Sequence, residues 1–287
     1  MASSILSLPK LRISPHKVIS AQIYDFLRKH ITETNITPGT ILSENSLSKH
    51  FNVSRQPVRE ALMRLSYEGM LRVMPQRGSV VERISVSEIR QTVFVRTAIE
   101  KECVLNITNL KPKDREECLL QLERVLQQQK RLLQDEEEKD IRAAYLRLDD
   151  LFHERLCAIS GTNMAWNTIQ SLKGQMDRIR FLTFDKDVTP PETVTHEHEE
   201  IFAHLKTGDM KQCLVLLSQH LSNIIDTQKP IIRAYSDWFT PESLNMLRRD
   251  EAEMAEVKDK KTKAEGHGSV DKPKARASRT SAKKDAQ

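Results

Sequence analysis

Apolar residues recur at helical spacing near the start of the chain. They fall on one helix face at Ile19, Ile23, Phe26 and Leu27. Pro38-Gly39 ends this predicted element, and the short apolar pair Ile41-Leu42 follows it. Ser43 then begins a second helix, about residues 44–51, as its N-cap, and Asn52 breaks that helix. The pattern therefore predicts two helices with a short extended segment between them.

A third helix is predicted to run from Ser54 to about Glu68, where Gly69 stops it. Its apolar residues stand at i, i+3, i+4 and i+7 and should face a core: Val58, Ala61, Leu62 and Leu65. The polar residues of this helix then occupy the exposed faces. The second and third helices together suggest a helix-turn-helix.

The exposed residues of the third helix gather near its N-terminal tip. Arg55 and Arg59 are four residues apart and share one face. Because Pro57 lies in the first turn, Ser54, Arg55 and Gln56 stand at the tip, which in a recognition helix reaches base edges. Arginine offers two donors to guanine, and glutamine pairs similarly with adenine. The alternative is a basic, exposed helix on an ordinary α-domain.

Two short strand-like runs follow Gly69. Leu71–Val73 and Ser79–Arg83 flank a turn, Met74–Gly78, that contains a glycine and a cation. These runs predict a β-hairpin wing. Arg77 at its tip is placed to enter a minor groove, and Gly78 would let the backbone approach a phosphate.

The stretch LSENSLSKHFNVSRQPVREALMRLSYEGMLRVMPQRGSVV resembles the winged helix-turn-helix domain of GntR-family regulators. The likeness covers nearly all of residues 17–83, and the VSR-PVREAL and QRG elements are specific. It implies DNA contacts at Ser54, Arg55, Gln56, Arg59, Arg77 and Gly78. It also implies a homodimer on a palindromic double-stranded operator. The family often has arginine where this chain has Asn45, which puts one contact in doubt.

From Val86 to about Tyr235 the pattern is almost wholly helical and predicts an all-α bundle of six or so helices. The last residues offer little apolar surface to offset their ordering entropy. The fold class is therefore mostly α, with four predicted parts. These are a flexible arm (1–14), a winged helix-turn-helix (15–85), an effector-binding and dimerisation domain (86–240), and an extension (241–287) disordered from about 257.

Four polar residues adjoin the apolar stripes of three bundle helices. Asp149 and His153 are four apart on one helix, and His198 and His220 lie on two others. Buried imidazole and carboxylate groups need partners, and a divalent cation is an effective one. Three nitrogens and one carboxylate oxygen suit Zn²⁺ or Ni²⁺ better than Mg²⁺ or Ca²⁺. The alternative is that each histidine is a core residue hydrogen-bonded to a neighbour.

The segments DDLFH…SGTN and HEEIFAHLKTGD…QHL resemble the ligand-binding domain of the FadR-like (FCD) branch, over roughly residues 90–230. Metal-binding members place one aspartate and three histidines at Asp149, His153, His198 and His220. The resemblance therefore favours a metal at these four residues, with zinc ahead of nickel. His196 lies off the apolar stripe and is expected to face solvent, whereas the pattern leaves His204 ambiguous.

Small acid effectors in this branch bind beside the metal, so the resemblance implies a small carboxylate effector. Arg96 is a candidate to pair with that carboxylate, although Arg96 and Glu100, four residues apart, also suit a structural ion pair. The segments MPQRGSVV, FVRTAIE and SDWF resemble a repressor of this branch that is linked to a sugar-acid dehydratase operon. That likeness implies a sugar acid.

Charge is divided unevenly along the chain, whose net charge is +5. Residues 1–85 carry 12 Lys and Arg against 6 Asp and Glu, and residues 257–287 carry 10 against 4. The middle, 86–256, carries 23 against 30. A basic head on an acidic body indicates that the head meets a polyanion. The basic tail either adds sequence-independent DNA affinity or is a solvated tether.

No apolar run approaches the roughly 18 residues of a membrane helix, and the start lacks a secretory pattern, so we expect no membrane and a cytoplasmic location. Four cysteines stand far apart and are expected to be reduced and mostly buried: Cys103, Cys118, Cys157 and Cys213. The leading function is a ligand-released repressor. The alternatives are a metal-dependent hydrolase or lyase, for which no base or nucleophile motif is found, and a purely structural dimeriser.

Overall fold

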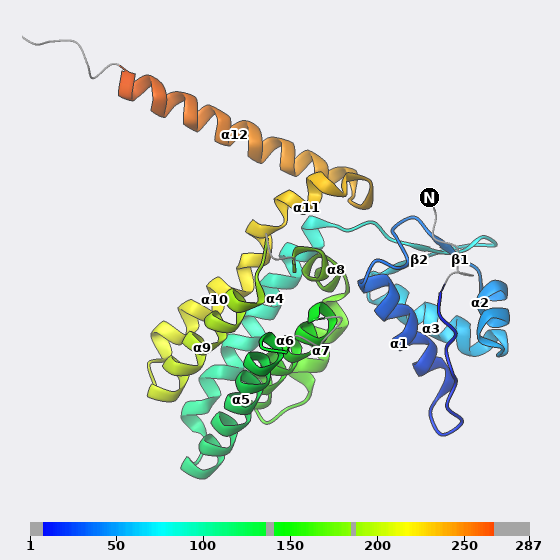
Figure 1. Cartoon of the computed structure of the whole chain (residues 1–287), viewed down its shortest axis with the longest axis horizontal. Helices are drawn as coiled ribbons and strands as arrows, with labels where there is room; N and C mark the ends of the chain where they lie inside the picture. Colours follow the sequence, from blue (N-terminus) through cyan, green and yellow to red (C-terminus); the bar gives the residue numbers. More distant parts are fainter. Residues whose placement is uncertain (1–7, 136–140, 185–187, 267–287) are drawn as a thin grey trace, which may run out of the picture. The chain divides into compact units, whose positions relative to one another are not determined.

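The computed structural model describes residues 8–135, 141–184 and 188–266. The chain up to Leu244 forms one compact unit, and the residues from Asn245 onward form a second. Helices dominate the ribbon of Figure 1, as the sequence predicted.

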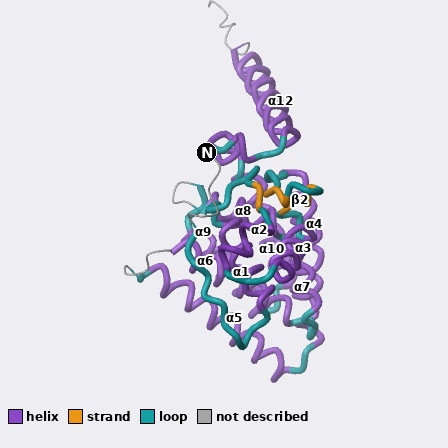
Figure 2. Tube along the Cα trace, turned by 90° about the vertical axis from the view of Figure 1, so that its right-hand side faces the viewer, coloured by secondary structure: helices purple, strands orange, loops and turns teal. Residues whose placement is uncertain are grey.

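The N-terminal domain contains three helices and three short strands in the predicted order. They are α1 (Ile19–Thr32), β1 (Ile41–Leu42), α2 (Glu44–Phe51), α3 (Arg55–Tyr67), β2 (Leu71–Met74) and β3 (Gly78–Val81). The strands form an antiparallel sheet in the order β1-β3-β2. Figure 2 shows this sheet as the orange segments near the label β2. The predicted winged helix-turn-helix is confirmed.

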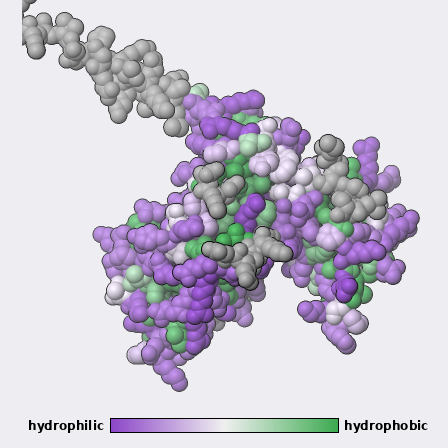
Figure 3. All heavy atoms as spheres, in the orientation of Figure 1, coloured by the Kyte–Doolittle hydropathy of each residue, from purple (hydrophilic) through white to green (hydrophobic). Residues whose placement is uncertain are grey.

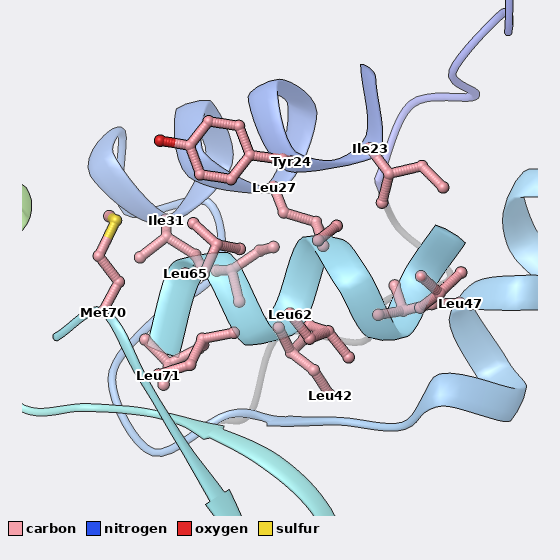
Figure 4. Close-up of a cluster of buried hydrophobic side chains, with 14 of the residues drawn as sticks. Ile23, Tyr24, Leu27, Ile31, Leu42, Leu47, Leu62, Leu65, Met70 and Leu71 are labelled. Carbon is pink, nitrogen blue, oxygen red and sulfur yellow. The ribbon is translucent and has the colours of Figure 1, made fainter. Parts of the chain in front are cut away.

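The core of this domain lies between α1 and α3. In Figure 4, Ile23, Leu27 and Ile31 of α1 face Leu62 and Leu65 of α3. All five side chains are buried, with at most 2% of their surface exposed. The predicted inward face of α3 is therefore confirmed. Burial of this apolar surface stabilises the domain.

The first residues of the described chain are not a loose arm. Leu8 is buried in the core of the N-terminal domain, and Leu11 and Ile13 pack against the same core. Ser14 is also fixed, because its N–H donates to Gln22 Oε1 at 2.8 Å. The prediction of a flexible arm is therefore wrong for residues 8–14, since these apolar side chains bury on the domain. The rest of that predicted arm, residues 1–7, lies outside the described residues.

The bundle has more helices than the six or so that the pattern predicted. Its helices are α4 (Val86–Leu105), α5 (Pro112–Leu133), α6 (Ile141–Ala158), α7 (Met164–Leu172), α8 (Gly174–Thr183), α9 (Pro191–Thr207), α10 (Met210–Thr227) and α11 (Lys229–Ala234). The shortest are α7, α8 and α11, which hydrophobic spacing does not separate from their neighbours. Cys103, Cys157 and Cys213 are buried here and Cys118 is half-buried, all as free thiols.

The connection between the two domains pairs with the chain beyond the bundle. Ile84 donates its N–H to Trp238 O at 2.8 Å and accepts from Thr240 N at 3.0 Å. Phe239, between these two residues, is fully buried. Val86 N donates to Ser243 Oγ at 2.9 Å. The SDWF segment therefore fixes the path by which the chain leaves the winged helix.

The last helix, α12 (Pro241–Gly266), extends past the boundary at which disorder was predicted. Residues 257–266 are helical here although disorder was predicted from about 257, and their alanine, glutamate and lysine are strong helix formers. Residues 267–287 lie outside the described part. Among the described residues no helix combines the length and apolar character needed to cross a membrane. The face in Figure 3 is largely hydrophilic.

Candidate DNA-binding surface and metal centre

The tip of α3 is exposed, as predicted. Ser54, Arg55 and Gln56 are all exposed, and Pro57 behind them is half-buried. Ser54 stands at the N-cap position with an extended backbone, but its side chain makes no capping hydrogen bond. Its hydroxyl is therefore not committed to the helix. Gln56 Nε2 donates to Glu60 Oε1 at 3.0 Å.

Arg59 is held by a residue that the sequence reading missed. Glu44, the first residue of α2, accepts from Arg59 Nε at 3.1 Å and from Arg59 Nη2 at 3.0 Å. A bidentate carboxylate fixes the plane of a guanidinium. Glu44 directly follows the Ser43 N-cap, where a negative charge also suits the positive end of the helix dipole. The structure thus orients Arg59 before any DNA arrives.

The wing and α3 border one groove. Its lining includes Arg55 and Arg59 from α3, Arg77 and Gly78 from the wing, and Asn45 from α2. The structure therefore brings together four of the six predicted DNA-contacting residues. Ser54 and Gln56 are outside this lining, at the exposed tip of α3.

Gly78 has a structural role beside its predicted contact with a phosphate. Its φ is +101°, and a Cβ there would lie 2.5 Å from the carbonyl oxygen of Leu42. A side chain at this position would therefore collide with β1, which pairs with β3 next to Gly78. Glycine is needed here for both the backbone angle and the close approach.

In the bundle, the four predicted metal ligands converge. Asp149 and His153 project from α6, His198 from α9 and His220 from α10. One ligand atom of each lies within 4.8 Å of the others. The Nε2 atom of His220 is 3.1 Å from that of His153 and 3.3 Å from that of His198. Asp149 Oδ1 is 3.6 Å from His198 Nε2, and Oδ2 is 3.9 Å from His153 Nε2.

Each imidazole is oriented by an acceptor on its outer side. His153 Nδ1 lies 2.7 Å from Glu100 Oε2, His198 Nδ1 3.1 Å from Gln129 Oε1, and His220 Nδ1 2.7 Å from Glu197 Oε2. Because these oxygens accept, each Nδ1 carries a hydrogen and each ring turns its Nε2 atom inward, an atom that carries a lone pair when the ring is neutral. Lone pairs about 3 Å apart repel one another unless a cation lies among them. This donor set therefore fits a metal ion.

The distances and the protonation states also suit a metal. Ligand atoms of a tetrahedral zinc site, with bonds of about 2.0–2.1 Å, lie about 3.4 Å apart. Burial lowers the pKa of both His153 and His198 well below the usual value, so their rings are neutral at pH 7. Burial also raises the pKa of Glu100, and the Arg96 guanidinium opposes that rise. The cluster can hold a metal ion.

A cavity of about 180 Å³ adjoins this cluster. Its lining includes Asp149, His153 and His220 together with two arginines, Arg96 and Arg180. Arg96 is buried and its Nε donates to Glu100 Oε1 at 2.5 Å, so the expected ion pair exists. Its buried Nη2 has no hydrogen-bond partner among the described residues. Arg96 therefore combines a structural ion pair with a free donor.

Two other histidines of the bundle lie outside the cluster. His196 is exposed, as predicted, while His204 is 37% exposed and pairs with Asp209 at 3.2 Å. Sequence reasoning missed Gln129 and Glu197. Gln129 had a signal, because it continues the stripe of Leu122, Val125 and Leu126 on α5 and is fully buried. A buried glutamine on an apolar stripe needs a polar partner.

Comparisons with known proteins agree with this geometry. Residues 19–81 match the family model described as bacterial regulatory proteins, gntR family, and residues 91–223 match the FCD domain. The HTH-type transcriptional repressor RspR of Escherichia coli (strain K12) is 38% identical over 231 residues, which are 80% of this chain and 98% of that protein. The gluconate operon transcriptional repressor of Bacillus subtilis (strain 168) is 28% identical over 70% of this chain and 81% of its own length.

A solved structure, E. coli McbR/YncC, has a TM-score of 0.55 and 22% identity, covering 79% of this chain and all of that one. This likeness supports the fold. The relatives are transcription regulators and not enzymes, so the hydrolase or lyase alternative is rejected. The two family models and the E. coli repressor, which matches along almost its whole length, identify the same family. This chain belongs to the GntR family of bacterial transcription regulators and carries an FCD domain.

Proposed function

We propose that the protein is a cytoplasmic, homodimeric repressor that releases a palindromic operator when a small carboxylate metabolite binds beside a metal ion. The observation that carries this proposal is the buried Nη2 of Arg96, which has no hydrogen-bond partner within the described part of the chain. Arg96 lines the cavity that adjoins the cluster of Asp149 and three histidines. A buried guanidinium donor next to a metal matches a carboxylate, which can use one oxygen for each.

The operator contacts that we propose are Ser54, Arg55, Gln56 and Arg59 of α3 and Arg77 and Gly78 of the wing. The exposed tip of α3 and the shared groove support them. Gel shift with a DNA fragment upstream of the protein's own operon tests them. Arg55→Ala and Arg59→Ala should each weaken binding by about 1–3 kcal/mol. Arg124→Ala, at an exposed site on α5, should leave binding unchanged. Unchanged affinity in both α3 variants would refute this recognition helix.

The metal is zinc in this proposal, with nickel as the second candidate, held by Asp149, His153, His198 and His220. When bound, it would act as a Lewis acid that takes up an oxygen of the effector. Metal analysis of the purified protein is the test: His153→Ala and His220→Ala should lose the metal, whereas His196→Ala, at an exposed site on α9, should keep it. Equal metal content in all the proteins would refute the site and favour a purely structural domain.

The cavity favours a hydroxylated acid. Its lining includes Arg96 and Thr189, and in both residues a buried polar atom, Nη2 or Oγ1, has no partner among the described residues. These two atoms suit a carboxylate and a hydroxyl. The volume is below the roughly 300 Å³ at which drug-sized pockets begin, so the ligand is small. The relative named for the gluconate operon is consistent with a sugar acid.

A thermal-shift screen of sugar acids and dicarboxylates against the metal-loaded protein tests the effector class. A sugar acid should raise the melting temperature of the wild type, and Arg96→Gln should reduce that shift while keeping the metal. The identified acid should also weaken operator binding in the gel shift. A ligand that raises the melting temperature of both proteins equally would show that Arg96 does not bind the effector.

The dimer in this proposal forms through α4. Phe94 on this helix is 76% exposed, an unusual position for a large aromatic side chain in water. Ala98 and Leu105 are also exposed on α4, so the helix has apolar surface beyond the face that packs in the bundle. A second copy would cover this surface and supply the second recognition helix that a palindrome requires.

A further inference from the structure

Arg180, on α8, donates hydrogen bonds to three carboxylates and lines two separate hollows. Its Nη2 bonds Asp149, the carboxylate of the proposed metal centre. Its Nη1 donates to Asp150 Oδ1 at 2.9 Å and to Asp177 Oδ1 at 3.1 Å. The side chain lines the cavity beside the proposed centre and also a second hollow whose wall includes Arg28 of α1. Arg180 therefore connects the proposed sensing site with the neighbourhood of the winged helix.

Asp177 continues this connection into the N-terminal domain. Its Oδ1 accepts from Arg180 and from Lys173, and its Oδ2 accepts from Arg28 Nη2 at 2.7 Å. Arg28 Nε lies 3.3 Å from Glu68 Oε2, and Glu68 is the C-cap residue of α3. We call the four residues Asp149, Arg180, Asp177 and Arg28 the ion-pair chain. It runs without a break from the proposed metal centre to α1, one contact from the end of the DNA-reading helix.

Other contacts between the two domains are of a different kind. Gln175 Nε2 donates to the backbone oxygen of Gly69 at 2.8 Å, and Arg178 Nη1 donates to that of Glu82 at 2.7 Å. Backbone carbonyls keep a constant partial charge, and neither of these bonds involves a proposed metal ligand. These two hydrogen bonds hold the domains together, and we expect them not to depend on whether a metal is bound.

The ion-pair chain responds to charge at the centre for a simple reason. A divalent cation on Asp149 takes up much of the negative charge that otherwise attracts Arg180. An anionic ligand in the cavity offers Arg180 a further acceptor. The guanidinium has a fixed set of donors in one plane, so a change on the Asp149 side alters its bonds to Asp150 and Asp177. Because Arg180 and Arg28 share Asp177, the contact with α1 changes too.

We propose that the ion-pair chain couples occupancy of the metal centre to the stability of α1 in the winged helix. This inference rests on the proposed function, because it requires a metal at Asp149. Such a coupling is reciprocal. If zinc changes the affinity for DNA through α1, then bound DNA changes the affinity for zinc by the same factor.

Hydrogen exchange of the full chain, stripped of metal or loaded with Zn²⁺, tests the coupling. In the wild type, zinc should slow exchange in α6, α9 and α10 and should change the exchange rates in α1 at least two-fold. In Asp177→Asn and Arg28→Gln, the three bundle helices should respond as before and the response of α1 should be lost. The matched control is Gln175→Ala, which removes a contact between the domains outside the ion-pair chain and should keep the response of α1.

The outcomes separate this inference from the proposed function. Zinc that protects the bundle helices without any response in wild-type α1 would overturn the coupling and leave the metal centre standing. Equal α1 responses in the wild type and either folded variant would overturn it as well. Failure of the wild type to bind zinc would overturn the metal centre and the coupling together. Arg28 is the more exposed partner, so Arg28→Gln decides the question if Asp177→Asn does not fold.

Discussion

At the residue scale, the orientation of three imidazoles makes the cluster in the bundle a candidate metal centre. Two of the outer acceptors, Glu100 and Glu197, are carboxylates, and the third is the amide oxygen of Gln129. Outer acceptors of this kind fix the tautomer of a histidine ligand and raise its basicity. The orientation of the rings therefore depends on residues that do not touch the metal.

Glu197→Gln should lower the affinity for Zn²⁺ by about 10- to 100-fold, the usual effect of removing an outer-shell partner. Glu197 accepts from His220 Nδ1 through Oε2 and from Asn223 Nδ2 through Oε1. A glutamine has only one acceptor oxygen, so one of these donors would face an NH₂ group. Competition with a chromophoric chelator measures the affinity. Glu192→Gln, at an exposed site on the same helix, should bind like the wild type; equal affinities for all three proteins would contradict the role of Glu197.

How far the sequence predicted the site depends on the range of the contacts. Asp149 and His153 are four residues apart on one stripe, and His198 and His220 adjoin the stripes of two other helices, so the local pattern named all four residues. The family resemblance then favoured a metal among them. Contacts such as that of Arg180 with Asp149 join different helices, so no regular spacing in the sequence predicts them. Glu44 with Arg59 is the same case in the N-terminal domain.

At the scale of elements, strand and helix positions followed from the apolar pattern wherever a core selects one face. α3 and β3 are examples, since their more buried residues recur at the period expected for a helix and a strand. The pattern failed at the two ends of the chain. Residues 8–14 bury apolar side chains without any periodicity, and α12 is helical through the propensity of its residues.

Gly78→Ala should destabilise the N-terminal domain by at least about 2 kcal/mol, the sum of a left-handed backbone angle and an overlap with β1. Gly161 is the matched control, because its φ is +73° and a Cβ there meets nothing within 4 Å. Gly161→Ala should therefore cost only about 1–2 kcal/mol, the backbone penalty alone. Urea unfolding of both variants measures the difference. Equal losses would show that the approach of Gly78 to Leu42 is not tight.

At the scale of the whole molecule, charged contacts between the two domains make stability depend on pH. Burial by itself would raise the pKa of Asp177, but Lys173, Arg28 and Arg180 together lower it below the usual value. Asp150 also faces this group and has its own pKa lowered by Lys173 and Arg180 against burial. The folded protein therefore binds fewer protons than the unfolded chain in mild acid.

The stabilisation from Asp177 should be complete above the unfolded pKa of about 3.9 and should be lost as the pH falls through the lower folded pKa. Between pH 5 and pH 3, the free energy of unfolding should fall less steeply in Asp177→Asn than in the wild type. One carboxylate accounts for a slope of at most about 1.4 kcal/mol per pH unit. Urea titrations at several pH values measure this slope. Glu116→Gln, exposed on α5, should keep the wild-type slope. Identical slopes in all three proteins would mean that Asp177 is not stabilised by its cations.

The division of charge gives the N-terminal domain the net positive charge needed to approach DNA. A palindrome also requires two such domains at a fixed distance and orientation, which a dimer provides.

If the exposed face of α4 forms the dimer interface, Phe94→Glu should weaken dimerisation by 30-fold or more, the roughly 2 kcal/mol expected of a central aromatic contact. Sedimentation velocity measures the dimer. Binding to the full operator should fall with it, while binding to a single half-site should not change, because Phe94 is remote in sequence from the DNA-reading helix. Val215→Glu introduces the same charge at a 43% exposed position on α10 and should leave the dimer intact. A Phe94→Glu protein that dimerises like the wild type would place the interface on another face of the protein.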